Sequence, residues 1–88
     1  MGNQNRWFYD EFTDNYFLGN ELLGRWYEHN SDGFMVLVYW DVVLQAYKGM
    51  YSVNQNVWYY TNKFWNLIEC QKYCEIEITK LLKNRHLI

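Results

Sequence analysis

The sequence predicts an α+β fold: an N-terminal helix, a three- to four-stranded antiparallel sheet, and a C-terminal helix packed on one sheet face. Three observations predict this order. Apolar residues near both ends of the chain recur at the three- and four-residue spacing of an amphipathic helix, and the middle is rich in β-branched and aromatic residues. Turn-forming residues divide that middle part into strand-sized pieces. Because the chain has 88 residues, no proline and no linker-like stretch, we expect residues 1–88 to form a single domain.

The first expected element is a helix over residues 5–18. Aromatic side chains recur every four residues along one side of it, and acidic side chains occupy the other side. The aromatic residues are Phe8, Phe12 and Tyr16, and the acidic residues are Asp10, Glu11 and Asp14. The helix dipole stabilises acidic residues near the start of a helix, and Gly19-Asn20 can end it. The aromatic content is also typical of a β-strand, so that alternative stays open.

The middle of the chain is expected to form the sheet. Its strands are predicted at Leu22–His29, Phe34–Val43, Leu44–Val53 and Val57–Tyr60, with turns at 30–33 and 54–56. Asp32-Gly33 supplies the positive backbone angles that a tight hairpin needs, and a bend or bulge is expected at Lys48-Gly49. The second strand is apolar on both faces except at Asp41. We therefore expect a central strand that is covered on both faces, or covered on one and available for contacts on the other.

The last expected element is a helix over residues 62–83. Thr61 or Asn62 can cap its start, and basic residues gather near its end, where the helix dipole favours them. Its apolar stripe consists of Phe64, Leu67, Cys70 or Cys74, Ile78 and Leu81. We expect this stripe to pack on Val36, Val38 and Trp40. Residues 74–78 alternate as in a strand, so an earlier end of the helix stays open.

Composition and charge indicate contact with a partner. The chain has five Trp, nine Tyr and five Phe, which together offer more ring surface than a core of this size encloses. Some rings are therefore expected at the surface, where apolar patches usually mark a partner site. The net charge is −2, with seven acidic and two basic residues in 1–46 against three acidic and six basic residues in 47–88. This distribution indicates two faces of opposite charge, or two halves that attract each other.

The sequence contains no recognisable catalytic or cofactor-binding motif. A structural zinc site needs about four Cys or His ligands at suitable spacing. The candidates here are Cys70, Cys74, His29 and His86, and their spacing favours buried thiols instead. No glycine pattern matches a phosphate-binding loop or a serine elbow. We expect no enzyme activity, no cofactor and no metal.

The same residues bear on the cellular compartment. Cys70 and Cys74 lie one helical turn apart, where a disulfide has unsuitable geometry, and reduced thiols are typical of the cytoplasm. The first residues do not resemble a signal peptide, and no segment approaches the roughly 20 apolar residues of a membrane span. We expect a cytoplasmic protein with no membrane association.

The best interpretation is a small protein-binding module that contacts its partner through acidic and aromatic side chains. The residues expected to bind are Asp10, Glu11, Asp14, Glu21, Trp58 and Tyr60. Tyr and Trp anchor interfaces well because they bury a large area with few rotatable bonds. In type, the chain resembles small accessory proteins of phages and mobile elements that inhibit a host protein such as a defence nuclease. In that case the acidic residues would enter a basic groove.

Two other functions stay open. The basic C-terminal half interleaves aromatic and basic residues from Tyr47 to Trp65, which suits stacking on single-stranded nucleic acid, although usable basic residues are few. Nucleic acid is therefore the less expected partner. The third possibility is a symmetric homodimer in which the surplus aromatic residues pair with themselves.

Overall fold

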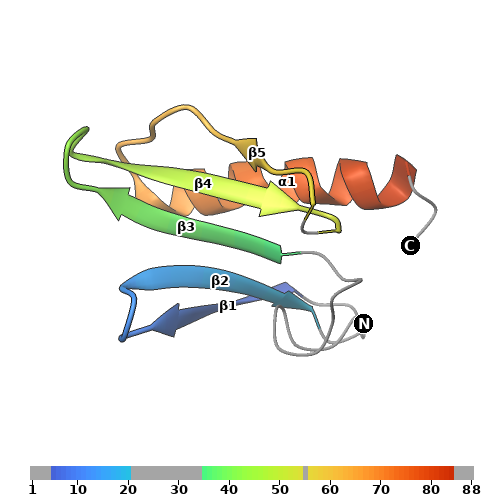
Figure 1. Cartoon of the computed structure of the whole chain (residues 1–88), viewed down its shortest axis with the longest axis horizontal. Coiled ribbons are helices and arrows are strands. Elements are labelled where there is room, and N and C mark those ends of the chain that lie inside the picture. Colours follow the sequence, from blue (N-terminus) through green and yellow to red (C-terminus); the bar gives the residue numbers. More distant parts are fainter. Residues whose placement is uncertain (1–4, 21–34, 55, 85–88) are drawn as a thin grey trace.

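Five strands form one antiparallel sheet in which each strand pairs with the next one along the chain (Figure 1). The computed structural model describes residues 5–20, 35–54 and 56–84. Its elements are β1 (Asn5–Asp10), β2 (Asn15–Asn20), β3 (Met35–Asp41), β4 (Ala46–Ser52), β5 (Tyr59–Tyr60) and α1 (Leu67–Asn84). The α+β class and the C-terminal helix are confirmed. The described residues form five strands, rather than the three to four expected for the sheet.

The predicted N-terminal helix is wrong, because residues 5–20 form the β1–β2 hairpin. Pairing is continuous from Asn5 opposite Asn20 to Asp10 opposite Asn15. Two causes favour the hairpin over a helix. Consecutive aromatic residues suit strands, and Asp10 offers the backbone a turn instead of a helical hydrogen bond. The four-residue spacing of Phe8, Phe12 and Tyr16 arose by coincidence, since Phe12 lies in the turn between the strands.

Two aspartates close the two hairpins in the same way. In the first turn, the Asp10 carboxylate accepts hydrogen bonds from the Phe12 amide at 2.9 Å and the Thr13 hydroxyl at 3.1 Å. In the second turn, the Asp41 carboxylate accepts one from the Leu44 amide at 3.0 Å. Both turns end in a residue with positive φ, 64° at Asp14 and 55° at Gln45. Four-residue loops of this kind are common hairpin connections.

The predicted strands in the second half of the sheet are largely confirmed. β3 and β4 are shorter than expected because residues 42–45 form the turn between them, and β5 keeps only the end of the fourth predicted strand. The expected bulge at Lys48-Gly49 is absent, since the β3–β4 register is unbroken there. The predicted strand at 22–29 and turn at 30–33 lie outside the described residues.

The C-terminal helix starts later than predicted. Asn66 caps it by accepting a hydrogen bond from the Glu69 amide at 3.1 Å. The predicted cap Thr61 instead belongs to the sheet, where its amide donates to the Gly49 carbonyl at 2.9 Å and its hydroxyl accepts from the Gly49 amide at 2.9 Å. Asn62, the other predicted cap, is also in this extended segment. The helix continues to Asn84, so the early end left open at residues 74–78 does not occur.

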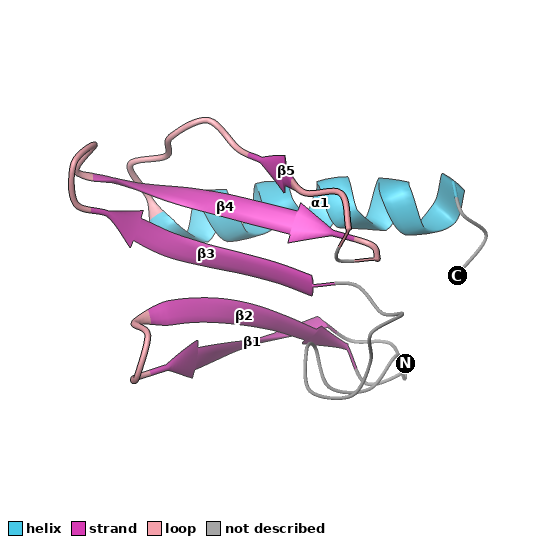
Figure 2. Ribbon diagram, in the orientation of Figure 1, coloured by secondary structure: helices cyan, strands magenta, loops and turns pink. Residues whose placement is uncertain are grey.

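The core lies between α1 and one face of the sheet (Figure 2). Its buried residues are Leu18, Val36, Val38, Tyr51, Val53, Cys70, Cys74 and Ile78. α1 packs against β3 and β4. Val36 and Val38 meet the helix as predicted, whereas the third predicted contact, Trp40, is 44% exposed and pairs with the Tyr47 ring. Within the described residues, no helix has both the length and the apolar character needed to cross a membrane.

Gly49 sets how closely α1 approaches the sheet. A Cβ atom at this position would overlap Cys74 Sγ and would lie 3.3 Å from Thr61 Cγ2. A glycine here lets the helix backbone come close to β4. Farther along the sheet, Trp7 Nε1 of β1 donates a 2.6 Å hydrogen bond to the Glu75 carboxylate of α1. The helix is therefore fixed to the sheet both over β4 and toward β1.

Candidate functional site

Three segments lie together at one end of the sheet, and we call this surface the hairpin end (residues 11–14, 42–45 and 62–66). In a sheet of consecutive antiparallel strands, every second turn lies at the same end, so the first two segments share that end (Figure 1). The third segment joins them because Tyr47 and Phe64 exchange two backbone hydrogen bonds of 2.8 Å. That pairing places residues 62–66 beside the first residues of β4.

Apolar side chains are exposed on all three segments. The exposed fractions are 92% for Phe12, 70% for Val42, 90% for Val43 and 70% for Trp65. Isolated exposed apolar side chains are ordinary, but a group that converges on one end of a small protein is typical of an interaction surface. An aromatic residue at such a site can supply much of the binding energy.

The segment that carries Trp65 is held on both sides. Phe64 is fixed by its backbone hydrogen bonds to Tyr47, and its ring lies 5.5 Å from the Tyr73 ring of α1. Lys63 Nζ is 5.2 Å from the centre of the Trp65 ring, a cation–π contact. Because the backbone around it is already ordered, Trp65 can be buried by a partner with a small loss of conformational entropy.

The structure brings the predicted acidic residues Asp10, Glu11 and Asp14 together at or beside the hairpin end, but with different tasks. The Asp10 carboxylate is half-buried and holds the turn. Asp14 accepts a hydrogen bond from the Tyr9 hydroxyl, and this bond raises the pKa of Tyr9 to about 12. Glu11 is exposed next to Phe12. Glu11 is therefore the acidic residue best placed to meet a partner without disturbing the turn.

The other predicted binding residues do not belong to this surface. Trp58 is half-buried, and Tyr60 is exposed in β5, which pairs with the far half of β4. Tyr60 lies opposite Met50, on the sheet face away from α1. Glu21 lies outside the described residues. Of the six predicted residues, three are therefore close together at the hairpin end.

Sequence reasoning missed the apolar part of the hairpin end. The sequence pattern predicts Val42 and Val43 at the end of a strand and Trp65 in a helix. The available signal was Asp41, which ends an apolar run and can close a turn with its own carboxylate, as Asp10 does. Neither turn contains glycine or proline, the residues from which turns are most readily predicted.

The two cysteines are core residues. Cys70 and Cys74 are free thiols, and both are fully buried between α1 and the sheet. The pKa of Cys74 is raised by its hydrogen bond with Cys70 and by burial. The same hydrogen bond lowers the pKa of Cys70. Cys74 is a poor nucleophile because its thiol stays protonated, and full burial keeps Cys70 away from reactants in solvent. In the part of the chain that the structure describes, no three His, Cys, Asp or Glu side chains gather where they could hold a metal ion.

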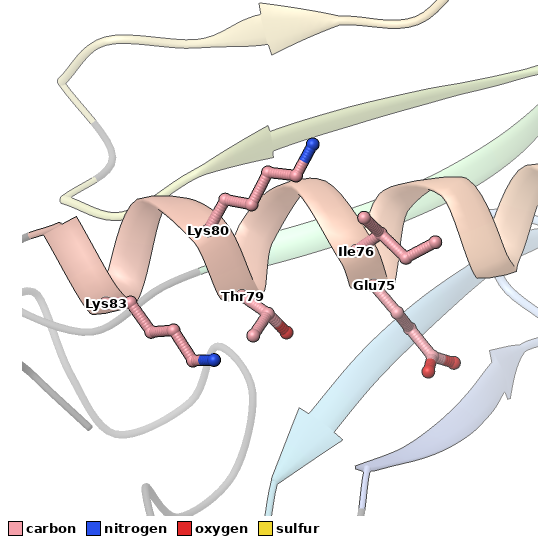
Figure 3. Close-up of a pocket in the computed structure, with 5 residues that line it drawn as sticks. All are labelled: Glu75, Ile76, Thr79, Lys80 and Lys83. Atoms are coloured by element: carbon pink, nitrogen blue, oxygen red, sulfur yellow. The ribbon is translucent and has the colours of Figure 1, made fainter.

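A shallow hollow of about 310 Å³ lies alongside α1 (Figure 3). Its described lining consists of Glu75, Ile76, Thr79, Lys80 and Lys83. Lys80 also lies 3.3 Å from the Glu77 carboxylate, within the same helix. These residues come from successive turns of one helix, and the Glu75 carboxylate is already hydrogen-bonded to Trp7. The hollow is a weaker candidate site than the hairpin end.

Comparison of the chain with protein families, curated proteins and solved structures found no match. The assignment of a site therefore depends on the geometry of this chain. Its strongest feature is the hairpin end, where exposed apolar side chains lie next to the acidic first turn.

Proposed function

We propose that this chain is a non-enzymatic protein-binding module whose contact surface is the hairpin end. The observation that carries the proposal is the exposure of Phe12, Val42, Val43 and Trp65 on three segments whose backbones are fixed by hydrogen bonds. Fully burying a large apolar side chain contributes about 1.5–3 kcal/mol. A partner that covers these four side chains would therefore gain a substantial part of the free energy that association costs, which is about 4–15 kcal/mol.

The charge around these side chains indicates the chemistry of the partner. Glu11 and Asp14 are exposed beside Phe12, and Asp41 borders the second turn. A complementary surface would have an apolar centre and basic residues on the side of the first turn. Such charges mainly speed association and select the partner. A host protein with a basic groove, such as a defence nuclease, has this chemistry. The more specific version of the proposal is that the chain inhibits such a protein.

Binding of single-stranded nucleic acid is the less favoured function. Two of the rings it would need, Tyr47 and Tyr51, pack in or against the core. Lys63 contacts Trp65 within the chain. Tyr59 and Tyr60 stay exposed, but stacking needs several rings along a basic groove.

A capture experiment with the wild type, two variants of the hairpin end and one control variant tests the proposal. The wild type, Val43→Asp and Trp65→Ala are immobilised and exposed to nuclease-treated lysate of the cells that naturally contain the chain. We expect the wild type to retain a specific protein, and we expect each substitution to weaken capture at least tenfold, because an exposed anchor is lost. Ile76→Asp is the matched control, since Ile76 is exposed on α1, away from the hairpin end.

The controls separate a lost contact from a lost fold. Val43 and Trp65 are both mostly exposed, so the melting temperatures of these variants should stay close to that of the wild type. Equal capture by all four folded forms would refute the hairpin end as the contact surface. A protein that is retained from untreated lysate but not from nuclease-treated lysate would favour the nucleic-acid alternative.

A further inference from the structure

β1 is an edge strand of the sheet. It pairs with β2 along its whole length, and none of the other described strands lies along its outer side. An edge strand presents a row of backbone groups that can pair with another chain. Natural edges are usually protected by proline, a bulge or central charges. β1 contains no proline, its register is unbroken, and its charged residues, Arg6 and Asp10, flank an aromatic centre.

The sequence of β1 is self-complementary. It reads Arg6-Trp7-Phe8-Tyr9-Asp10, with aromatic residues at the three central positions and opposite charges on either side. An antiparallel pair of two such strands centred on Phe8 places Phe8 opposite Phe8 and Trp7 opposite Tyr9. The same register places Arg6 of each copy opposite Asp10 of the other. Aromatic pairs and opposite charges at directly opposed positions both stabilise an antiparallel pair.

The opposite edge of the sheet does not offer this arrangement. β5 has only two residues, and the chain that follows it stays alongside β4 through the Thr61 and Phe64 hydrogen bonds. α1 packs on β3 and β4, and among the described elements β2 alone lies alongside β1. A second copy can therefore approach β1 with its own helix on the same face of the sheet.

We infer that the protein forms a symmetric homodimer through antiparallel pairing of β1 with β1 of a second copy, in the register centred on Phe8. The two sheets then become one continuous sheet of ten strands, twice the five of one chain, with both helices on one face. On the other face, one row of opposed residues crosses each sheet: Phe8, Phe17, Leu37, Met50 and Tyr60. In the dimer, the two rows join at Phe8.

Charge complementation at position 8 tests the register. Because Phe8 faces its own symmetry mate, Phe8→Lys and Phe8→Glu each place two like charges directly opposite each other. Sedimentation velocity should give the wild type twice the 10.9 kDa mass of one chain and each variant the mass of one chain. An equimolar mixture of the two variants should regain a dimer with one copy of each, which native mass spectrometry identifies. Only a contact between the two residues at position 8 predicts this rescue.

The outcome is decided by the wild type and by the mixture. A monomeric wild type at high protein concentration would overturn the inference, as would a dimer that survives Phe8→Lys or a mixture that stays monomeric. Larger, open-ended assemblies would indicate pairing without the two-fold axis and would also contradict it. Phe12→Lys is the matched control and should leave the dimer intact, because Phe12 lies in the turn beyond β1. It should weaken partner capture, so the two proposals can fail separately.

Discussion

At the scale of single residues, Asp10 and Asp41 show how one side chain type determines where a strand ends. Each is the last residue of its strand, and each uses its carboxylate to accept hydrogen bonds from the turn that follows. An aspartate offers this alternative to the backbone, which explains why the strands stop there although apolar residues follow Asp41. The exposed Val42 and Val43 are thus presented by a turn that Asp41 holds.

We predict that Asp41→Ala lowers the free energy of unfolding by about 1 kcal/mol, the usual net value of one such hydrogen bond. The reason is that the Leu44 amide loses its acceptor. Urea denaturation measures the change. Val43→Ala is the control, and it should have almost no effect because Val43 is almost fully exposed. Equal stability of Asp41→Ala and the wild type would mean that the carboxylate does not hold the turn.

Tyr51 is expected to lower the free energy of unfolding at alkaline pH. Burial, and next the charge of Glu77, raise its pKa from 10.0 to about 12. Below pH 10 the folded and unfolded chains both keep this proton, so its contribution to stability is fully present. Between pH 10 and 12 the unfolded chain releases the proton first, so a rise in pH favours unfolding.

We therefore predict that the free energy of unfolding falls as the pH rises from 10 to 12, and that the fall is smaller in Tyr51→Phe. Urea denaturation at a series of pH values measures both slopes. Tyr9 contributes in the same direction, because its hydrogen bond to Asp14 also raises its pKa to about 12. For this reason the dependence of the free energy of unfolding on pH should be weaker in Tyr51→Phe than in the wild type, but it should still be measurable. Identical slopes in the wild type and the variant would rule out the role of Tyr51.

At the scale of the elements, the short distance between α1 and β4 depends on a glycine, Gly49, which has no side chain. Gly49 lies under the helix, where a Cβ atom would overlap Cys74 Sγ. We predict that Gly49→Ala destabilises the protein by about 1–3 kcal/mol, the usual cost of overpacking a core. Cys74→Ala removes the overlapping atom at the cost of a small cavity.

A double-mutant cycle in urea checks this contact. Gly49→Ala combined with Cys74→Ala should be more stable than the sum of the two single effects, because the new methyl group occupies the space of the lost sulfur. Strictly additive effects would show that α1 can shift away from β4 and that Gly49 does not set their distance.

The elements differ in how far they could be predicted from the sequence. α1 and the β3–β4 pair are long and strongly patterned, and they appear within a few residues of their expected places. The β1–β2 hairpin was mistaken for a helix because Phe12, in the turn, completes a false helical spacing between Phe8 and Tyr16. The start of α1 was missed because residues 61–64 pair with β4, a tertiary contact that local capping signals do not reveal.

At the scale of the whole molecule, the alternation of turns gathers distant residues. Glu11, Val43 and Trp65 are far apart in the sequence, yet they lie at the same end of the sheet because two hairpins and the segment before α1 share that end. The acidic part of this surface could be anticipated from its local cluster of charges. The apolar part could not, since its members are neighbours only after the five strands have paired.

Site-specific photocrosslinking tests the central claim, that the hairpin end contacts a partner protein, most directly. A photoreactive phenylalanine analogue is placed at Val43 in one form and at Ile76 in another, and both are irradiated in the cells that naturally contain the chain. We predict a nuclease-resistant adduct with a different protein at position 43 and none at position 76. Adducts of equal yield at both positions, or adducts at 43 that contain only a second copy of this chain, would contradict the account.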